Sequence, residues 1–134
     1  MDPDAAAKEA VAAKFQTAGQ DCLAANRLFV HRKIYDAFIE RFVVHMQALK
    51  VGNGLEESDI GPLIHKRAVD MAKGFVEDGI SKGARQLGGE GQPPGENFFM
   101  PTLLADITPE MRVFREETFS PVAGVCAFDD DDEV

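Results

Sequence analysis

The segment VAGVCAF, residues Val122 to Phe128, is a continuous apolar run of strand length. A strand with one face in water alternates apolar and polar side chains, whereas an uninterrupted apolar run is typical of a sheet that is covered on both faces. We therefore predict a buried strand here. Cys126 lies inside the run, and an apolar strand interior explains its unpaired thiol as a structural residue.

Three helices are predicted upstream of this strand. Asp2 before Pro3 is typical of a cap followed by proline in the first turn, and strong helix formers continue from about Asp4 to Phe15. Two further helices are predicted by apolar residues that recur at three- and four-residue steps. They comprise Tyr35, Phe38, Ile39, Phe42, Val43, Met46 and Leu49, with Gly52 closing the helix, and Ala68, Met71, Ala72, Phe75, Val76 and Ile80, ending at Gly83.

Short extended segments separate these helices. RLFV (27–30) and ARQL (84–87) are predicted strands, and FFMPTLL is an extended piece interrupted by Pro101. Thr108 followed by Pro109 resembles the start of a short helix. Strands that alternate with amphipathic helices indicate βαβ units, so the predicted fold class is α/β, with a mainly parallel sheet and flanking helices.

Length and charge exclude several classes of partner. The 134 residues are enough for one domain with its own core, and a net charge of −9 argues against nucleic acid or an anionic membrane as a partner. No apolar run approaches the length that spans a bilayer, and the amino terminus lacks the pattern of a signal peptide. The two cysteines and three histidines have no metal-ligand spacing, so we expect no metal site and a cytoplasmic protein.

The stretch KFQTAGQDCLAANRLFV, residues 14 to 30, contains the other cysteine, Cys22, in a turn with Gly19. A thiol attacks as its thiolate, and the backbone N–H groups of a glycine turn could stabilise that anion. The N–H of Cys22 could also bind the oxygen of a carbonyl attacked by its sulfur. The alternative is a small core residue, because free cysteine is among the most buried residue types.

This stretch resembles the active-site signature of the aldehyde dehydrogenase family, F-x-x-x-G-Q-x-C-x-x-x-x-R. The signature is matched by Phe15, Gly19, Gln20, Cys22 and Arg27. Later segments resemble further family landmarks in the same order, namely IGPLI (60–64), NFFMPTLL (97–104) and FREETFSPV (114–122). The resemblance covers essentially the whole chain, and within the family it is greatest to the succinate-semialdehyde dehydrogenase group.

The resemblance implies roles for particular residues. Cys22 would attack an aldehyde, giving a thiohemiacetal that passes hydride to NAD or NADP and leaves a thioester for water to hydrolyse. A second family motif, E-E-x-F-G-P, falls on residues 116–121, so Glu117 would bind the nicotinamide ribose and Phe119 the nicotinamide end. Asp21 and Leu23 would border the aldehyde pocket. Without the resemblance, Glu117 would be interpreted as a solvated carboxylate and Phe119 as a core aromatic residue.

Two residues of this sequence, Ser120 and Gln16, depart from the family's pattern. Ser120 stands where the second motif has glycine, so if that position needs a positive φ, its backbone should be strained or re-routed. Gln16 lies in the substrate pocket by position, where the succinate-semialdehyde group usually has an arginine that pairs with the substrate carboxylate. Arg27 is expected to brace its strand and not to touch substrate.

Other parts of the family's machinery have no counterpart in this sequence. There is no glycine-rich dinucleotide turn before Cys22, no E-L-G-G motif with the general-base glutamate, and no asparagine assigned to the oxyanion site. We therefore predict that residues 1–134 are part of a catalytic domain, without the cofactor-binding domain, from a longer enzyme that forms a homo-oligomer. The isolated chain is expected not to bind NAD or NADP and not to turn over.

Two other functions stay open at this level. The chain could be a non-catalytic fragment that acts only as a folding or oligomerisation module through uncovered apolar surface. Residual thiol chemistry at Cys22 could also give slow esterase activity without a cofactor.

Overall fold

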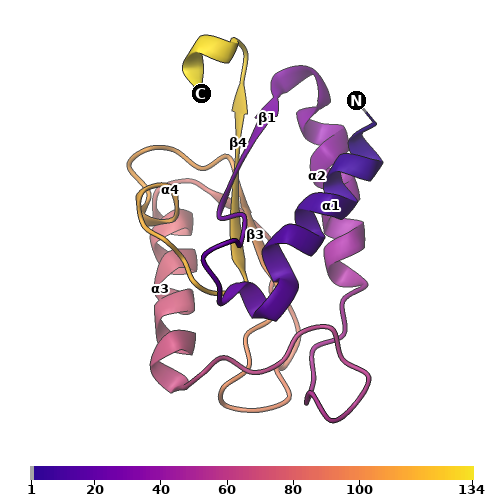
Figure 1. Ribbon diagram of the computed structural model, residues 1–134. Helices are drawn as coiled ribbons and strands as arrows, with labels where there is room; N and C mark the ends of the chain where they lie inside the picture. The colour runs from indigo at the N-terminus through magenta and orange to yellow at the C-terminus, as the bar shows by residue number, and fades with distance from the viewer. Residues whose placement is uncertain (1) are drawn as a thin grey trace.

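The computed structural model describes residues 2–134 and contains a four-stranded sheet with helices around it (Figure 1). The strands are β1 (Arg27–His31), β2 (Arg85–Gly88), β3 (Thr102–Ala105) and β4 (Val122–Phe128). The α-helices are α1 (Pro3–Phe15), α2 (Tyr35–Gln47), α3 (Lys66–Ser81) and α4 (Arg112–Arg115). Three short 3-10 helices are η1 (Gln16–Gly19), η2 (Arg32–Ile34) and η3 (Asp131–Glu133).

The sheet has the order β1-β4-β3-β2. β4 pairs in parallel with both β1 and β3, while β2 pairs antiparallel to β3 at one edge. In Figure 1, α1 and α2 lie on one side of the sheet and α3 and α4 on the other. The predicted α/β class with a mainly parallel sheet is confirmed.

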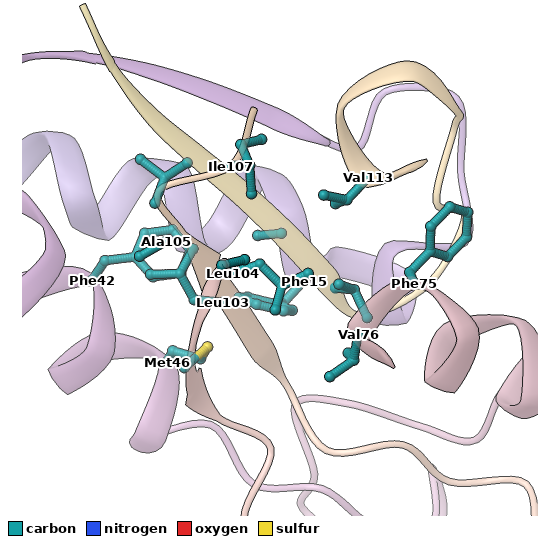
Figure 2. Close-up of a cluster of buried hydrophobic side chains, with 14 of the residues drawn as sticks. Phe15, Phe42, Met46, Phe75, Val76, Leu103, Leu104, Ala105, Ile107 and Val113 are labelled. Atoms are coloured by element: carbon teal, nitrogen blue, oxygen red, sulfur yellow. The ribbon is translucent and has the colours of Figure 1, made fainter. Parts of the chain in front are cut away.

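The core lies on both faces of the sheet (Figure 2). Leu103 and Leu104 are both fully buried although they are successive strand residues, whose side chains point to opposite faces. Phe42 and Met46 of α2 reach one face, and Phe75 of α3 reaches the other. The first five residues of β4 are also buried, as the apolar run predicted.

The helices begin and end close to the predicted residues, except for α4. The side chain of Asp2 accepts a hydrogen bond from the amide of Asp4 at 3.0 Å, which caps α1 as expected. The predicted start of a helix at Thr108 is wrong. Residues 108–111 form a turn, and α4 begins at Arg112, whose amide donates to the carboxylate of Asp78 in α3 at 2.8 Å. A cap supplied by another helix therefore sets the start of α4.

Two loops that carry the motifs reach the sheet at the same end. The segment with Cys22 leads into β1, and the segment 117–121 leads into β4. Since β1 and β4 are adjacent and parallel, the residues before each strand lie close together. None of the helices in residues 2–134 is both long and apolar enough to cross a membrane.

Candidate active site

Backbone contacts join the two loops directly. The carbonyl of Asn26, just before β1, accepts a hydrogen bond at 3.0 Å from the amide of Gly124 in β4. Earlier in the same loop, Gly19 lies so close to Ser120 that a Cβ on the glycine would overlap the carbonyl oxygen of Ser120. The cysteine motif and the E-E-x-F motif, far apart in sequence, therefore lie next to each other at one end of the sheet.

The approach to Cys22 is an unusual left-handed turn. Thr17, Ala18 and Gly19 have φ values of 54°, 57° and 71° in succession. Only glycine adopts this conformation without a steric penalty, so the backbone at Thr17 and Ala18 is strained. Such strain persists where the surrounding contacts fix the chain, and here the contact of Gly19 with Ser120 does so. Two features therefore require glycine at position 19, namely its positive φ and its close packing against Ser120.

Cys22 lies on the surface of the turn that follows. Its side chain is exposed, and the next residue, Leu23, is 91% exposed. The alternative in which Cys22 is a core residue is therefore wrong. Asp21 organises the turn, because its carboxylate accepts a hydrogen bond from the amide of Leu23 at 2.8 Å and its carbonyl accepts one from Ala24 at 3.3 Å. Within residues 2–134 the amide of Cys22 has no such acceptor, so it is free to bind an oxygen of another molecule.

Asp21 keeps its charge at neutral pH. The hydroxyl of Thr17 donates to one oxygen of the carboxylate, while the amide of Leu23 donates to the other. The Thr17 hydrogen bond is the main cause that holds the pKa of Asp21 below its usual range, with smaller contributions from the turn amides and from the charge of Lys14. The residue before the exposed thiol is therefore a fixed anion.

A buried lysine lies behind the turn. Lys14, at the end of α1, is completely buried, and its ammonium donates to Oδ1 of Asn26 at 2.7 Å and to Oγ1 of Thr118 at 3.0 Å. Burial lowers the pKa of Lys14 from 10.5 to about 8, although Asp21 and then Glu117 act in the opposite direction. Lys14 thus connects the end of α1, the loop before β1 and the loop before β4.

A hollow of about 240 Å³ lies beside the turn, next to Phe119. Phe119 is 42% exposed and has φ 44°, so its interpretation as a core aromatic residue is wrong. Gln20 and Ile64 also line this hollow, and the side-chain carbonyl of Gln20 accepts a hydrogen bond from the amide of Ile64 at 2.9 Å. The other lining residues are His65, Ala68, Met71 and Thr118.

The two glutamates of the second motif have different environments. Glu116 forms a bidentate ion pair with Arg112, with both contacts at 2.9 Å. Glu117 is exposed and has no ion pair among residues 2–134. The carboxylate that is available to a ligand is therefore that of Glu117.

Arg27 donates to the carbonyl of Phe114 at 3.0 Å and braces β1, as expected.

Two further residues behave differently from their simplest interpretation. The left-handed residue of the second motif is Phe119 and not Ser120, so the strain expected at Ser120 does not fall there. Instead, the hydroxyl of Ser120 is buried without a hydrogen-bond partner within the described chain. Gln16 is exposed and lines a separate hollow of about 260 Å³ with Leu49 and Asp59.

The sequence motifs therefore located Cys22, Asp21, Leu23, Glu117 and Phe119 at one end of the sheet. They did not identify Lys14, Asn26 and Thr118, whose hydrogen bonds hold that end together. A lysine in the last turn of a helix is ordinarily solvated, and no feature of the sequence marks this one as buried. Residues 2–134 contain no group of three side chains arranged to hold a metal ion.

Comparisons with known proteins agree with this arrangement. A family model described as the aldehyde dehydrogenase family matches residues 1–134. An aspartate-semialdehyde dehydrogenase (non-phosphorylating) from Halomonas elongata is 62% identical over 136 residues, which cover 100% of this chain and 28% of the relative.

Solved structures give the same family. A succinate-semialdehyde dehydrogenase from Burkholderia pseudomallei has a TM-score of 0.94 at 40% identity, over 98% of this chain and 28% of that one. An NADP-dependent glyceraldehyde-3-phosphate dehydrogenase from Bacillus halodurans, solved with NADP, has a TM-score of 0.92 at 32% identity, over 98% of this chain and 27% of that one. Succinate-semialdehyde dehydrogenases are thus among the similar proteins, as the motifs predicted, and this chain spans little more than a quarter of their length.

Proposed function

The chain belongs to the aldehyde dehydrogenase family, and on that premise we propose that it supplies the catalytic thiol with which an NAD(P)-dependent enzyme oxidises a small semialdehyde to its carboxylic acid. The observation that carries this proposal is the exposure of Cys22 on a turn whose backbone is fixed and whose own amide is free. A nucleophile must be reachable by substrate and must keep its position, and both conditions are met here.

The attack on the aldehyde and the stabilisation of its oxyanion both use Cys22. The Cys22 thiolate attacks the aldehyde carbon, so a carbon–sulfur bond forms and the carbonyl π electrons move to the oxygen. The free amide of Cys22 donates a hydrogen bond to that oxygen and stabilises its negative charge. After hydride has left the carbon, the thioester on Cys22 is hydrolysed, which releases the acid and restores the thiol.

The residues around Phe119 suit a nicotinamide cofactor. The exposed carboxylate of Glu117 can accept hydrogen bonds from ribose hydroxyls, and the exposed ring of Phe119 offers an apolar face beside a hollow of about 240 Å³. When bound, NAD or NADP would accept the hydride. Our proposal therefore assigns Glu117 to the ribose and Phe119 to the nicotinamide end, in the complete enzyme and not in the isolated chain.

The substrate is proposed to be a four-carbon semialdehyde. The motifs favoured succinate semialdehyde, whereas the relative that is 62% identical is named for aspartate semialdehyde. Gln16, which is neutral and exposed, cannot provide the charged bidentate grip on a carboxylate that arginine would. Because Gln16 lines a hollow apart from the one beside Phe119, we do not assign it to the substrate pocket that the motifs predicted for it. Leu23, 91% exposed, supplies apolar surface next to the thiol.

A chimaera tests the proposal directly. Residues 1–134 would replace the matching segment of the Halomonas elongata relative, and aldehyde-dependent formation of NADH or NADPH would be measured. We expect activity that Cys22→Ala lowers by about a thousandfold or more, while the matched control Cys126→Ala retains it. Activity that survives Cys22→Ala would contradict the proposal. The chain by itself is expected to produce no reduced cofactor above its Cys22→Ala variant.

A second candidate function rests on an apolar hollow of about 530 Å³ along β1, lined in part by Leu28, Phe29 and Phe128. In this case the chain would be a folding or oligomerisation module. Sedimentation velocity tests the idea, because a monomer at all concentrations would contradict it. The two unpaired thiols support a reducing, cytoplasmic location for either function.

A further inference from the structure

Asp21 places a negative charge next to the proposed nucleophile. It directly precedes Cys22, and its carboxylate is ionised at neutral pH for the reasons given above. A fixed anion raises the free energy of a nearby alkoxide, such as the one that forms when a carbonyl is attacked. A carboxylate at this position therefore works against the chemistry unless something compensates for it.

The fold of the turn does not require this charge. Asp21 caps the turn by accepting hydrogen bonds from the amide of Leu23 and the hydroxyl of Thr17. An uncharged oxygen from asparagine, serine or threonine serves the same purpose at such turns. The cap explains the presence of an oxygen and leaves the negative charge unexplained.

The nearest positive charge does not reach the surface where a substrate would bind. Lys14 is completely buried and is hydrogen-bonded to Asn26 and Thr118. The charged groups that act on its ammonium are the carboxylates of the half-buried Asp21 and the exposed Glu117. An approaching molecule therefore meets carboxylates beside Cys22, with the balancing cation behind them.

We propose that Asp21 is a specificity-determining residue, which makes the Cys22 turn prefer aldehydes that carry an ammonium group close to the carbonyl over purely anionic semialdehydes. Each oxygen of the carboxylate accepts one hydrogen bond within the turn and has a further lone pair for a substrate donor. The inference rests on the proposed function, since it takes Cys22 as the nucleophile.

Charged thiol reagents test the electrostatic part on the 134-residue chain itself. Aminoethyl, sulfonatoethyl and methyl methanethiosulfonate each form a mixed disulfide with a thiolate and release methanesulfinate, and they differ mainly in charge. The rate of each charged reagent at Cys22 is divided by the rate of the neutral reagent. At low salt, we expect the ratio of the cationic to the anionic value to be about tenfold lower in Asp21→Asn than in the parent chain. Asp21→Thr, which also keeps a cap, should give the same fall.

The control is Glu40→Gln, which removes one charge from an exposed position of α2 and should leave the ratio unchanged. A ratio within twofold of the parent in both Asp21 variants would overturn the inference. If Cys22 fails to react even with the neutral reagent, the nucleophile of the proposed function is refuted instead. The two failures are therefore distinguishable.

Two aldehydes test the substrate preference. Aspartate semialdehyde and succinate semialdehyde have the same carbon chain and differ by one ammonium group. Reversible thiohemiacetal formation should protect Cys22 from the neutral reagent, and we expect aspartate semialdehyde to protect at the lower concentration. In Asp21→Asn the ratio of the two protecting concentrations should decrease about threefold or more. An unchanged difference would show that the ammonium group is recognised elsewhere and would overturn the assignment to Asp21.

Discussion

The two cysteines of this chain show how strongly the surroundings decide what a thiol can do. Cys22 is exposed on a strained turn before β1, whereas Cys126 is 8% exposed in the middle of the sheet. The sulfur of Cys126 lies 3.8 Å from the carbonyl of Leu28, and burial raises its pKa. The same side chain is thus accessible in one region and sealed in the other.

The two regions are also held in different ways. The strand around Cys126 depends on ladder hydrogen bonds and apolar packing on two faces, which many sequences can provide. The turn around Cys22 depends on single contacts, above all Gly19 against Ser120 and the buried ammonium of Lys14. Substitutions should therefore be tolerated better near Cys126 than near Cys22.

The largest effect is expected for a methyl group added to a glycine in each region. In Gly19→Ala the methyl would meet the backbone oxygen of Ser120 at a residue with φ 71°, and neither can move away easily. We expect this variant to lower the free energy of unfolding by about 4 kcal/mol.

Gly124→Ala in β4 is the matched control, because its methyl would meet Cδ1 of Ile107, the flexible end of a side chain. A loss of about 1 to 2 kcal/mol is expected there. Urea unfolding followed by circular dichroism measures both variants. Equal losses at Gly19 and Gly124 would remove the proposed difference between the regions.

The next effect concerns pH. The pKa of Lys14 is about 8 in the folded chain and 10.5 when unperturbed, so between these values the unfolded chain binds more protons. The free energy of unfolding should then rise with pH in that window, by about 3 kcal/mol from this group. For Cys126 the sign is opposite, because a folded pKa raised above 9.0 makes stability fall as pH increases beyond that value.

Lys14→Met separates the two contributions. Methionine has a similar length and no charge, so the variant should lose the rise while keeping the decrease due to Cys126. The free energy of unfolding of both chains is measured by chemical unfolding between pH 7 and pH 10.5, and the difference between the two chains is followed with pH. Parallel curves for the two chains would mean that the pKa of Lys14 is the same in the folded and the unfolded chain, which would contradict the shift caused by burial.

The smallest effect is expected at Ser120. Its hydroxyl is buried without a partner in the described part of the chain, and such a group lowers stability. Ser120→Ala should therefore raise the free energy of unfolding by about 1 kcal/mol. Thermal unfolding checks this, with Thr118→Ser as a control that keeps its hydroxyl. If Ser120→Ala is less stable than the parent chain, the hydroxyl must make a stabilising hydrogen bond in the folded protein.

Much of the fold could be predicted because its signals are local. The apolar run of β4 and the helical spacing in α2 and α3 identify these elements without any tertiary information. The start of α4 could not be predicted, since it depends on Asp78 in another helix. In the site, the motifs indicated Cys22 and Glu117, but Lys14 is buried by Thr118, which lies 104 residues away. Contacts of that separation leave no periodic pattern in the sequence.

The central claim is that the fold presents Cys22 and seals Cys126. Iodoacetamide labelling of the folded chain, followed by peptide mass spectrometry over time, tests it most directly. We predict that Cys22 is alkylated at least about a hundredfold faster than Cys126, and that both react at similar rates in urea. Comparable rates at the two cysteines in the folded chain, or protection of Cys22, would contradict the account.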